Sequence, residues 1–268
     1  GIPYYLSYFK KGLSLTANID NILFGKNPRL NDEFNRLFNA IFTNPEDCKK
    51  IISLLAKRHA GYTREEISEE TNLPFGGGLT NTLNALIESD FVQKYNPYNT
   101  HGKVVRYKLI DNFCLFWLKY VDENVHKSDF MTENISSEIL KSWRGVAFEE
   151  LCWQHINPIK RALGISGISS SLSAWNVKGD DNKEGVQIDL LISRNDNVVN
   201  LCEMKFAGDT YTIDKDEDAK LRNRIETLKQ TLSAKQSVHL TMITTFGITY
   251  GKYSGIVQKE VTMDDLFE

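Results

Sequence analysis

The sequence lacks the short motifs that mark nucleotide hydrolysis and zinc hydrolysis. It contains no G-x-x-x-x-G-K-[ST] phosphate loop and no H-E-x-x-H motif. It also lacks an apolar run of the roughly 18 to 20 residues that a membrane-spanning helix needs, since the longest candidate, Phe113 to Val121, is interrupted by Lys119. We therefore expect a soluble protein without membrane contacts.

Cysteines are also few, and neither positive nor negative charge predominates. The four cysteines lie far apart and form no C-x-x-C pair, which favours a reducing cytoplasm over a disulfide framework. Residues 1–125 contain 15 basic and 14 acidic side chains, and the remainder contains 17 and 21. Because neither half is strongly basic, any contact with nucleic acid is expected at a local patch.

The length and the first half of the chain indicate several folding units. At 268 residues, with 41% hydrophobic and 25% charged residues, the chain is long enough for about two globular domains. Helix-start signals occur at Asn44–Asp47 and Thr63–Glu66, and an apolar stripe predicts a helix over 79–89. Two β-rich runs then flank the loop 96–102. Three helices followed by a hairpin are typical of a winged helix-turn-helix.

The second half has a different pattern. An apolar helix follows Asp111 and ends in the charged stretch 122–128, which we take as the domain boundary. Beyond it we expect a long helix, three strands, a charged helix and two further β runs, over 137–163, 166–175, 186–193, 198–206, 214–232, 238–246 and near 256.

The strands 186–193 and 198–206 carry charges inside apolar runs. If Asn195–Asp196–Asn197 form the turn, Arg194 pairs with Val198, and counting back places Asp189 opposite Glu203. In that register Gln187 faces Lys205, and all four side chains share one face of the sheet.

Two carboxylates at this spacing repel each other, so a divalent cation is expected between them, and hard oxygen ligands suit Mg²⁺ or Mn²⁺. Such a cation would polarise the phosphate of a phosphodiester. Lys205, on the same face, could then hold that phosphate or orient the attacking water. The pattern [DE]-x-K occurs four times, but three occurrences lie in polar segments where a solvated charge pair is sufficient. Glu203-x-Lys205 alone interrupts an apolar strand.

A third carboxylate is expected from the long helix. Glu149 lies on a stripe with Val146, Cys152 and Trp153, and it is the favoured ligand. Glu150 is the alternative ligand. If both glutamates instead lie on an exposed face of the helix, neither has a role in the site.

Several basic or polar residues are candidates for nucleic-acid contact. The hairpin contributes Lys94, Arg106 and Lys108, which are interleaved with tyrosines, although such hairpins equally serve in packing. Next to the expected site the candidates are Gln187, Arg222 and Arg224. For the two arginines, on the charged helix, a solvated helix face is at least as good an explanation.

These features together resemble the PD-(D/E)xK nuclease superfamily, with its restriction-endonuclease-like fold. The resemblance is carried by Gly145 and Glu149 on a helix, then Asp189, then Glu203-x-Lys205. Ile188 stands where the superfamily's first motif often has proline. The resemblance implies catalytic roles for Glu149, Asp189, Glu203 and Lys205, with the three carboxylates as metal ligands.

Longer stretches resemble the C-terminal part of prokaryotic AAA+-type ATPases with a DUF234 domain. They include GIPYYL at 1–6, CEMKF at 202–206, ITTFG at 243–247 and DDLF at 264–267. This similarity implies an α+β multidomain chain: a helical lid remnant (1–43), a winged helix-turn-helix with an apolar linker helix (44–127) and an α/β/α nuclease-like domain with a mixed central sheet (128–268). It also implies that ATP is bound only by an ATPase module upstream of this chain, and that the protein assembles as a homo-oligomer.

The expected function is therefore a divalent-metal-dependent nuclease-like domain that acts on DNA within a cytoplasmic prokaryotic ATPase. Two alternatives stay open. In one, the nuclease fold is catalytically silent and the winged helix binds DNA. In the other, the region couples nucleotide hydrolysis to a partner protein.

Overall fold

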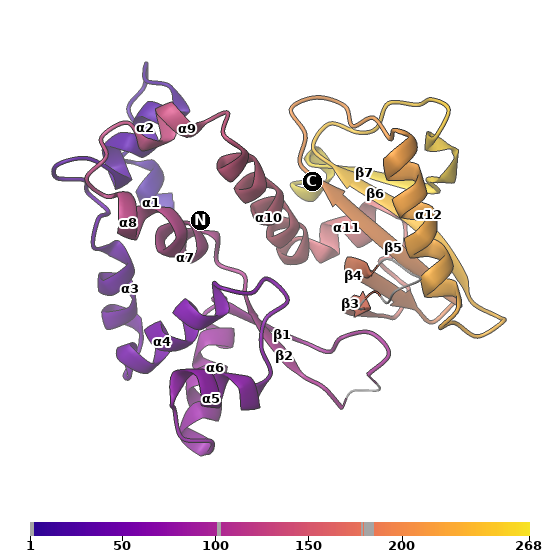
Figure 1. Ribbon diagram of the computed structural model, residues 1–268, viewed down its shortest axis with the longest axis horizontal. Coiled ribbons are helices and arrows are strands. Elements are labelled where there is room, and N and C mark those ends of the chain that lie inside the picture. The colour runs from indigo at the N-terminus through magenta and orange to yellow at the C-terminus, as the bar shows by residue number, and fades with distance from the viewer. Residues whose placement is uncertain (1–2, 101–102, 178, 180–184) are drawn as a thin grey trace. The chain divides into compact units, whose positions relative to one another are not determined.

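A computed structural model of the protein describes residues 3–100, 103–177, 179 and 185–268. The chain forms two compact units, which are coloured by residue number in Figure 1. Unit 1 comprises Gly1–Lys94 and Arg106–Arg144, and unit 2 comprises Tyr95–Val105 and Gly145–Glu268. The division after Arg144 falls inside a helix, later than the charged stretch that the sequence indicates as a boundary.

Unit 1 is mainly helical. Its elements are α1 (Pro3–Leu6), α2 (Leu15–Leu23), α3 (Glu33–Ile41), α4 (Pro45–Leu55), α5 (Arg64–Thr71), α6 (Gly77–Glu88), β1 (Val92–Tyr95), β2 (Arg106–Leu109), α7 (Asn112–Phe116), the π-helix η1 (Trp117–Val121), α8 (Asp122–Asn124), α9 (Phe130–Asn134) and the first part of α10 (Glu138–Gln154). Both predicted helix starts are present, and Thr63 forms a capping box with Glu66.

The core of unit 1 is aromatic, and one buried carboxylate ties its two ends together. Phe34 stacks on Trp117 with ring centroids 4.8 Å apart. Asp20 is buried and accepts hydrogen bonds from the backbone N–H groups of Met131 and Thr132, at 2.7 and 3.0 Å. These N–H groups lie in the first turn of α9, where a helix needs acceptors, so the charge of Asp20 is satisfied without solvent.

A third segment joins the hairpin of β1 and β2. Tyr62 pairs with Tyr107 in an antiparallel bridge. The preceding Gly61 has φ +67°, and a Cβ atom there would lie 2.1 Å from the carbonyl oxygen of Tyr107. Only glycine meets both conditions without strain.

Unit 2 is a mixed sheet with helices on both faces. Its elements are the remainder of α10, α11 (Ile156–Ala162), β3 (Ser170–Val177), β4 (Val186–Arg194), β5 (Val198–Lys205), α12 (Lys215–Lys229), β6 (Ser237–Thr244), η2 (Ser254–Ile256), β7 (Lys259–Thr262) and η3 (Asp264–Leu266). The strand order is β3-β4-β5-β6-β7, antiparallel from β3 to β5 and parallel from β5 to β7. The expected α+β class with a mixed sheet is confirmed.

Alternating residues of the strands supply two separate cores. One core faces α10 and α11 and contains Phe148, Cys152, Trp153, Ile159, Leu190, Ile192, Cys202 and Met204, among others. The other faces α12, which crosses the sheet in Figure 1, and contains Trp175, Ile188, Leu191, Leu201, Leu221 and Leu228, among others. We call these the α10 face and the α12 face.

The register of β4 and β5 follows the prediction, but a bulge changes the outcome. Leu190 pairs with Cys202 and Ser193 with Val199, as a turn at 195–197 requires. On the other side of β4, the pairing with β3 shifts between Ser173 and Trp175, so that Asp189 and Leu190 together oppose the single residue Ala174. This is a β-bulge at Asp189.

The bulge reverses the alternation of side chains along β4. Ile188 and Leu191 both belong to the core of the α12 face although they are three residues apart, whereas Leu190 belongs to the α10 face. Asp189 therefore shares the α10 face with Leu190, and Gln187, two residues earlier, also lies there.

Within the described ranges, no helix has both the length and the apolar character that crossing a bilayer requires.

Candidate functional site

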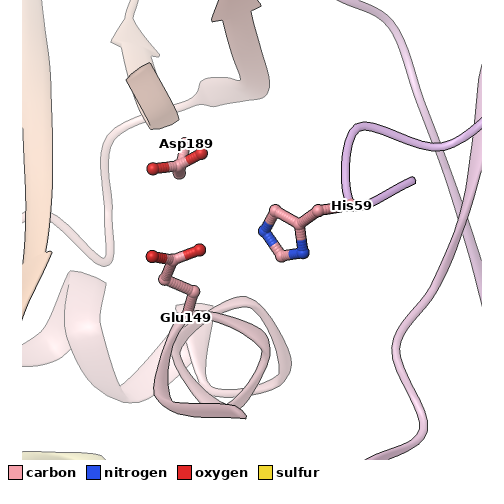
Figure 2. Close-up of side chains that lie close together, drawn as sticks. All are labelled: His59, Glu149 and Asp189. Carbon is pink, nitrogen blue, oxygen red and sulfur yellow. The ribbon is translucent and has the colours of Figure 1, made fainter. Parts of the chain in front are cut away.

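Two carboxylates meet at the start of β4. An oxygen atom of Glu149, on α10, lies within 4.8 Å of an oxygen atom of Asp189, on β4, and Figure 2 shows the two groups facing each other. Both side chains are half-buried. His59, also drawn in Figure 2, belongs to unit 1 and is not part of this pair. Glu150, the alternative to Glu149, is fully buried.

Neighbouring groups hold Asp189 at its side chain and at its backbone. The side-chain amide of Gln187 donates to Oδ1 of Asp189 at 2.7 Å. The indole Nε1 of Trp153 donates to the backbone carbonyl of Asp189 at 3.1 Å. Since Trp153 follows Glu149 by one helical turn, the same helix contributes a carboxylate and a donor to this part of β4.

Glu203 lies in a different group of charges. It is 7% exposed, and its two oxygens are used by different cations. Oε1 lies 2.9 Å from Nζ of Lys205, and Oε2 accepts a hydrogen bond of 2.7 Å from Nη1 of Arg224, on α12. Nζ of Lys205 also lies 3.0 Å from Glu217 of α12. Two carboxylates and two cations thus balance each other, which reduces the cost of burying each charge.

Titration behaviour follows from this arrangement. Burial alone would lower the pKa of Lys205, but the adjacent carboxylate of Glu203 outweighs it and raises that pKa. Burial raises the pKa of Tyr211 to about 12, with Lys205 opposing and Glu217 adding to the shift. Lys205 is therefore a fixed cation near neutral pH.

The expectation that Gln187, Asp189, Glu203 and Lys205 share one face is wrong. Arg224 and Glu217 lie on α12, so Glu203 and Lys205 point to the α12 face, while the bulge turns Asp189 and Gln187 to the α10 face. Within the described part of the chain, Glu149 and Asp189 converge as the sequence indicates, and Glu203 lies outside their group.

The hairpin candidates for nucleic-acid contact need correction. Lys108 is only 4% exposed, and Arg106 donates to the carbonyl of Gly61 and lies 3.6 Å from Glu66. Lys108 is therefore buried, the contacts of Arg106 lie inside unit 1, and only Lys94 of the three is exposed. On the other unit, Arg222 is exposed and binds Asp218 at 2.8 Å.

Comparisons with known proteins identify no relative of this chain. No family model matches the chain. Searches among curated proteins and solved structures also find no match.

Three residues of the site were not foreseen from the sequence. Glu217 and Tyr211 follow Lys205, the last charged residue of β5. Glu217 is one of the acids in the first turn of α12, where acidic residues are also expected without any role in a site. Trp153 was expected only as an apolar neighbour of Glu149. Its donor role depends on the distance between α10 and β4, for which the sequence contains no signal.

Proposed function

We propose that unit 2 is a PD-(D/E)xK nuclease-like domain that binds Mg²⁺ or Mn²⁺ and acts on DNA phosphodiesters, within the C-terminal region of a prokaryotic ATPase of the DUF234 type. Two features support this proposal. The domain is a mixed sheet between helices, and Glu149, Asp189 and Glu203-x-Lys205 lie in the order that this superfamily uses.

The bulge at Asp189 is the observation that carries the proposal. It turns Asp189 out of the plain alternation and toward Glu149, at a separation of no more than 4.8 Å. Two ionised carboxylates at that distance repel by about 3 kcal/mol at an effective dielectric constant of roughly 20. Carboxylate oxygens that converge in this way fit the donor set that Mg²⁺ and Mn²⁺ prefer.

Each residue has a defined role in this proposal. A divalent cation, when bound, supplies the Lewis acidity that polarises the scissile phosphate. Glu149 and Asp189 hold it, and Gln187 orients the Asp189 carboxylate through its amide. Glu203 points to the other face of the sheet, where Lys205 and Arg224 hold it, so this proposal does not use it as a ligand of the cation.

The same proposal assigns unit 1 a supporting role. The order α4, α5, α6, β1, β2 supports a winged helix-turn-helix over 44–127, preceded by a lid remnant over 1–43. ATP would be bound by another module of the same ATPase, in a cytoplasmic homo-oligomer.

One observation favours a second candidate function. Both oxygens of Glu203 are already neutralised by Lys205 and Arg224 on the α12 face, as in a structural ion-pair network. On this basis the nuclease-like fold would be catalytically silent and would serve DNA binding or protein interaction in the ATPase.

Nicking of supercoiled plasmid DNA in Mn²⁺ distinguishes the two. The first candidate predicts nicking by the wild-type protein and a loss of at least about a hundredfold in Asp189→Asn, which keeps the shape of the side chain. The matched control is Glu226→Gln, at an exposed acid of α12 that pairs with Lys229, and it should keep full activity. If the wild-type protein leaves plasmid intact but still retards it at low salt, the silent candidate is correct.

A further inference from the structure

A loop from the β1–β2 hairpin is built into unit 2. We call residues Tyr95–Thr100 the strap. Its Tyr98 N–H donates to the carbonyl of Ala174, on β3, at 2.8 Å. The ring of Tyr98 meets Trp175 edge-on, with centroids 5.7 Å apart. Since β3 is the outer strand of the sheet, the strap covers a backbone group that would otherwise lie at an open edge.

The strap reaches β3 at the position of the bulge. Ala174, which accepts the hydrogen bond from Tyr98, is the residue that Asp189 and Leu190 jointly oppose. A bulge leaves the ladder locally incomplete, so an additional hydrogen bond on its partner residue stabilises that irregular pairing.

A second contact joins the strap to Asp189 through the indole of Trp153. The ring of Tyr95 packs on that of Trp153 with centroids 6.0 Å apart. Trp153 is 4% exposed and donates Nε1–H to the Asp189 carbonyl at 3.1 Å. Two residues of the strap therefore contact the two neighbours of the Asp189 backbone: Tyr95 packs on Trp153 of α10, and Tyr98 donates to Ala174 of β3.

We infer that Trp153 is a positioning residue that sets Asp189 against Glu149, and that the docked strap fixes this setting, so that cation affinity depends on the strap. The inference rests on the proposed cation site. It makes the loop of the hairpin an internal brace of unit 2 and a route by which a change in the hairpin would alter cation binding. Loss of groups that orient a ligand typically weakens metal binding by about 10- to 100-fold.

The test uses the full chain and two independent measurements. Mn²⁺ affinity is measured by electron paramagnetic resonance for the wild type and for Trp153→Phe, Tyr98→Ala, Tyr98→Phe and Asp189→Asn. We expect Trp153→Phe and Tyr98→Ala to bind Mn²⁺ about tenfold more weakly than the wild type. Both variants should still unfold in a cooperative transition, which shows that they are folded before it. Both Tyr98 variants keep the backbone N–H, but only Tyr98→Phe also keeps the ring that packs on Trp175, so Tyr98→Phe should bind Mn²⁺ as the wild type does.

Hydrogen exchange supplies the measurement that needs no metal. We expect amides of 171–176 and 188–191 to exchange faster in Tyr98→Ala than in Tyr98→Phe. Unchanged Mn²⁺ affinity in Trp153→Phe and Tyr98→Ala, alongside a loss in Asp189→Asn, overturns the inference and leaves the proposed function intact. If the wild type shows no Mn²⁺ binding that depends on Asp189, the proposed function fails. In that case the hydrogen-exchange rates still test whether the strap stabilises the bulge. Equal rates in Tyr98→Ala and Tyr98→Phe would show that it does not.

Discussion

Glu203 illustrates how a single residue can be recognised in sequence and misjudged in its setting. A carboxylate inside an apolar strand needs compensation, and the sequence suggests a cation. In the structure, Lys205 and Arg224 supply that compensation, and Lys205 is shared with Glu217 of α12. The need for a partner followed from composition, but the identity of the partner depends on how α12 packs.

Removing Glu203 should destabilise the protein strongly. Glu203→Ala leaves Arg224 near the sheet without its carboxylate, and breaking a buried ion pair typically costs about 3 kcal/mol or more. Urea denaturation measures the change in the free energy of unfolding. Glu226→Ala, at a pair with exposed side chains, should change it by less than about 0.5 kcal/mol. Equal effects of the two substitutions would contradict the buried network.

Alkaline pH should weaken the same network through Tyr211. Because folding raises the pKa of Tyr211 to about 12, the folded state holds this proton more tightly than the unfolded state. The stabilisation is complete below pH 10 and is lost as the pH rises toward 12. Between pH 9 and 11 the wild type should lose about 1 kcal/mol more than Tyr211→Phe, after allowance for partial exposure. Parallel pH profiles of the two proteins in urea denaturation would contradict this.

At the scale of elements, the sequence predicts types and register well and irregularities poorly. The turn at 195–197 sets the pairing of β4 with β5, because turn residues and alternating apolar residues are local signals. The bulge at Asp189 arises from the pairing of β4 with β3, which lies on its other side. No local pattern specifies that shift, so the prediction that Asp189 and Glu203 share a face failed while the register itself held.

Two glycines should respond in opposite directions to alanine. At Gly61 a Cβ would lie 2.1 Å from a backbone oxygen at positive φ, so Gly61→Ala should cost at least about 2 kcal/mol of unfolding free energy. At Gly78, in α6, an added Cβ atom would have no neighbour within 4 Å among the described residues. Alanine there should raise the free energy of unfolding by about 0.5 kcal/mol through its higher helix propensity. Thermal unfolding followed by circular dichroism checks both signs, and destabilisation of similar size at both positions would contradict the account.

At the scale of the whole molecule, the order of structural elements along the chain was predictable and its division into units was not. Helices followed by a hairpin, and then strands with helices, follow from periodicity and turn residues, whereas the mixed pairing of the sheet was expected only from the family resemblance. The division falls inside α10, and Tyr95–Val105 belongs to unit 2 although β1 and β2, which it connects, pair with each other. Both features depend on contacts between distant residues, such as Tyr98 with Ala174, for which composition and charge contain no signal.

The central claim is that Glu149 and Asp189 together bind a divalent cation. A double-mutant cycle of Mn²⁺ affinity, with Glu149→Gln, Asp189→Asn and the double variant, tests it most directly. If both carboxylates hold one ion, each single substitution should weaken binding at least about tenfold and the double variant should lose little more than either single variant. Mn²⁺ affinity that is equal in the wild type and the double variant would contradict the claim.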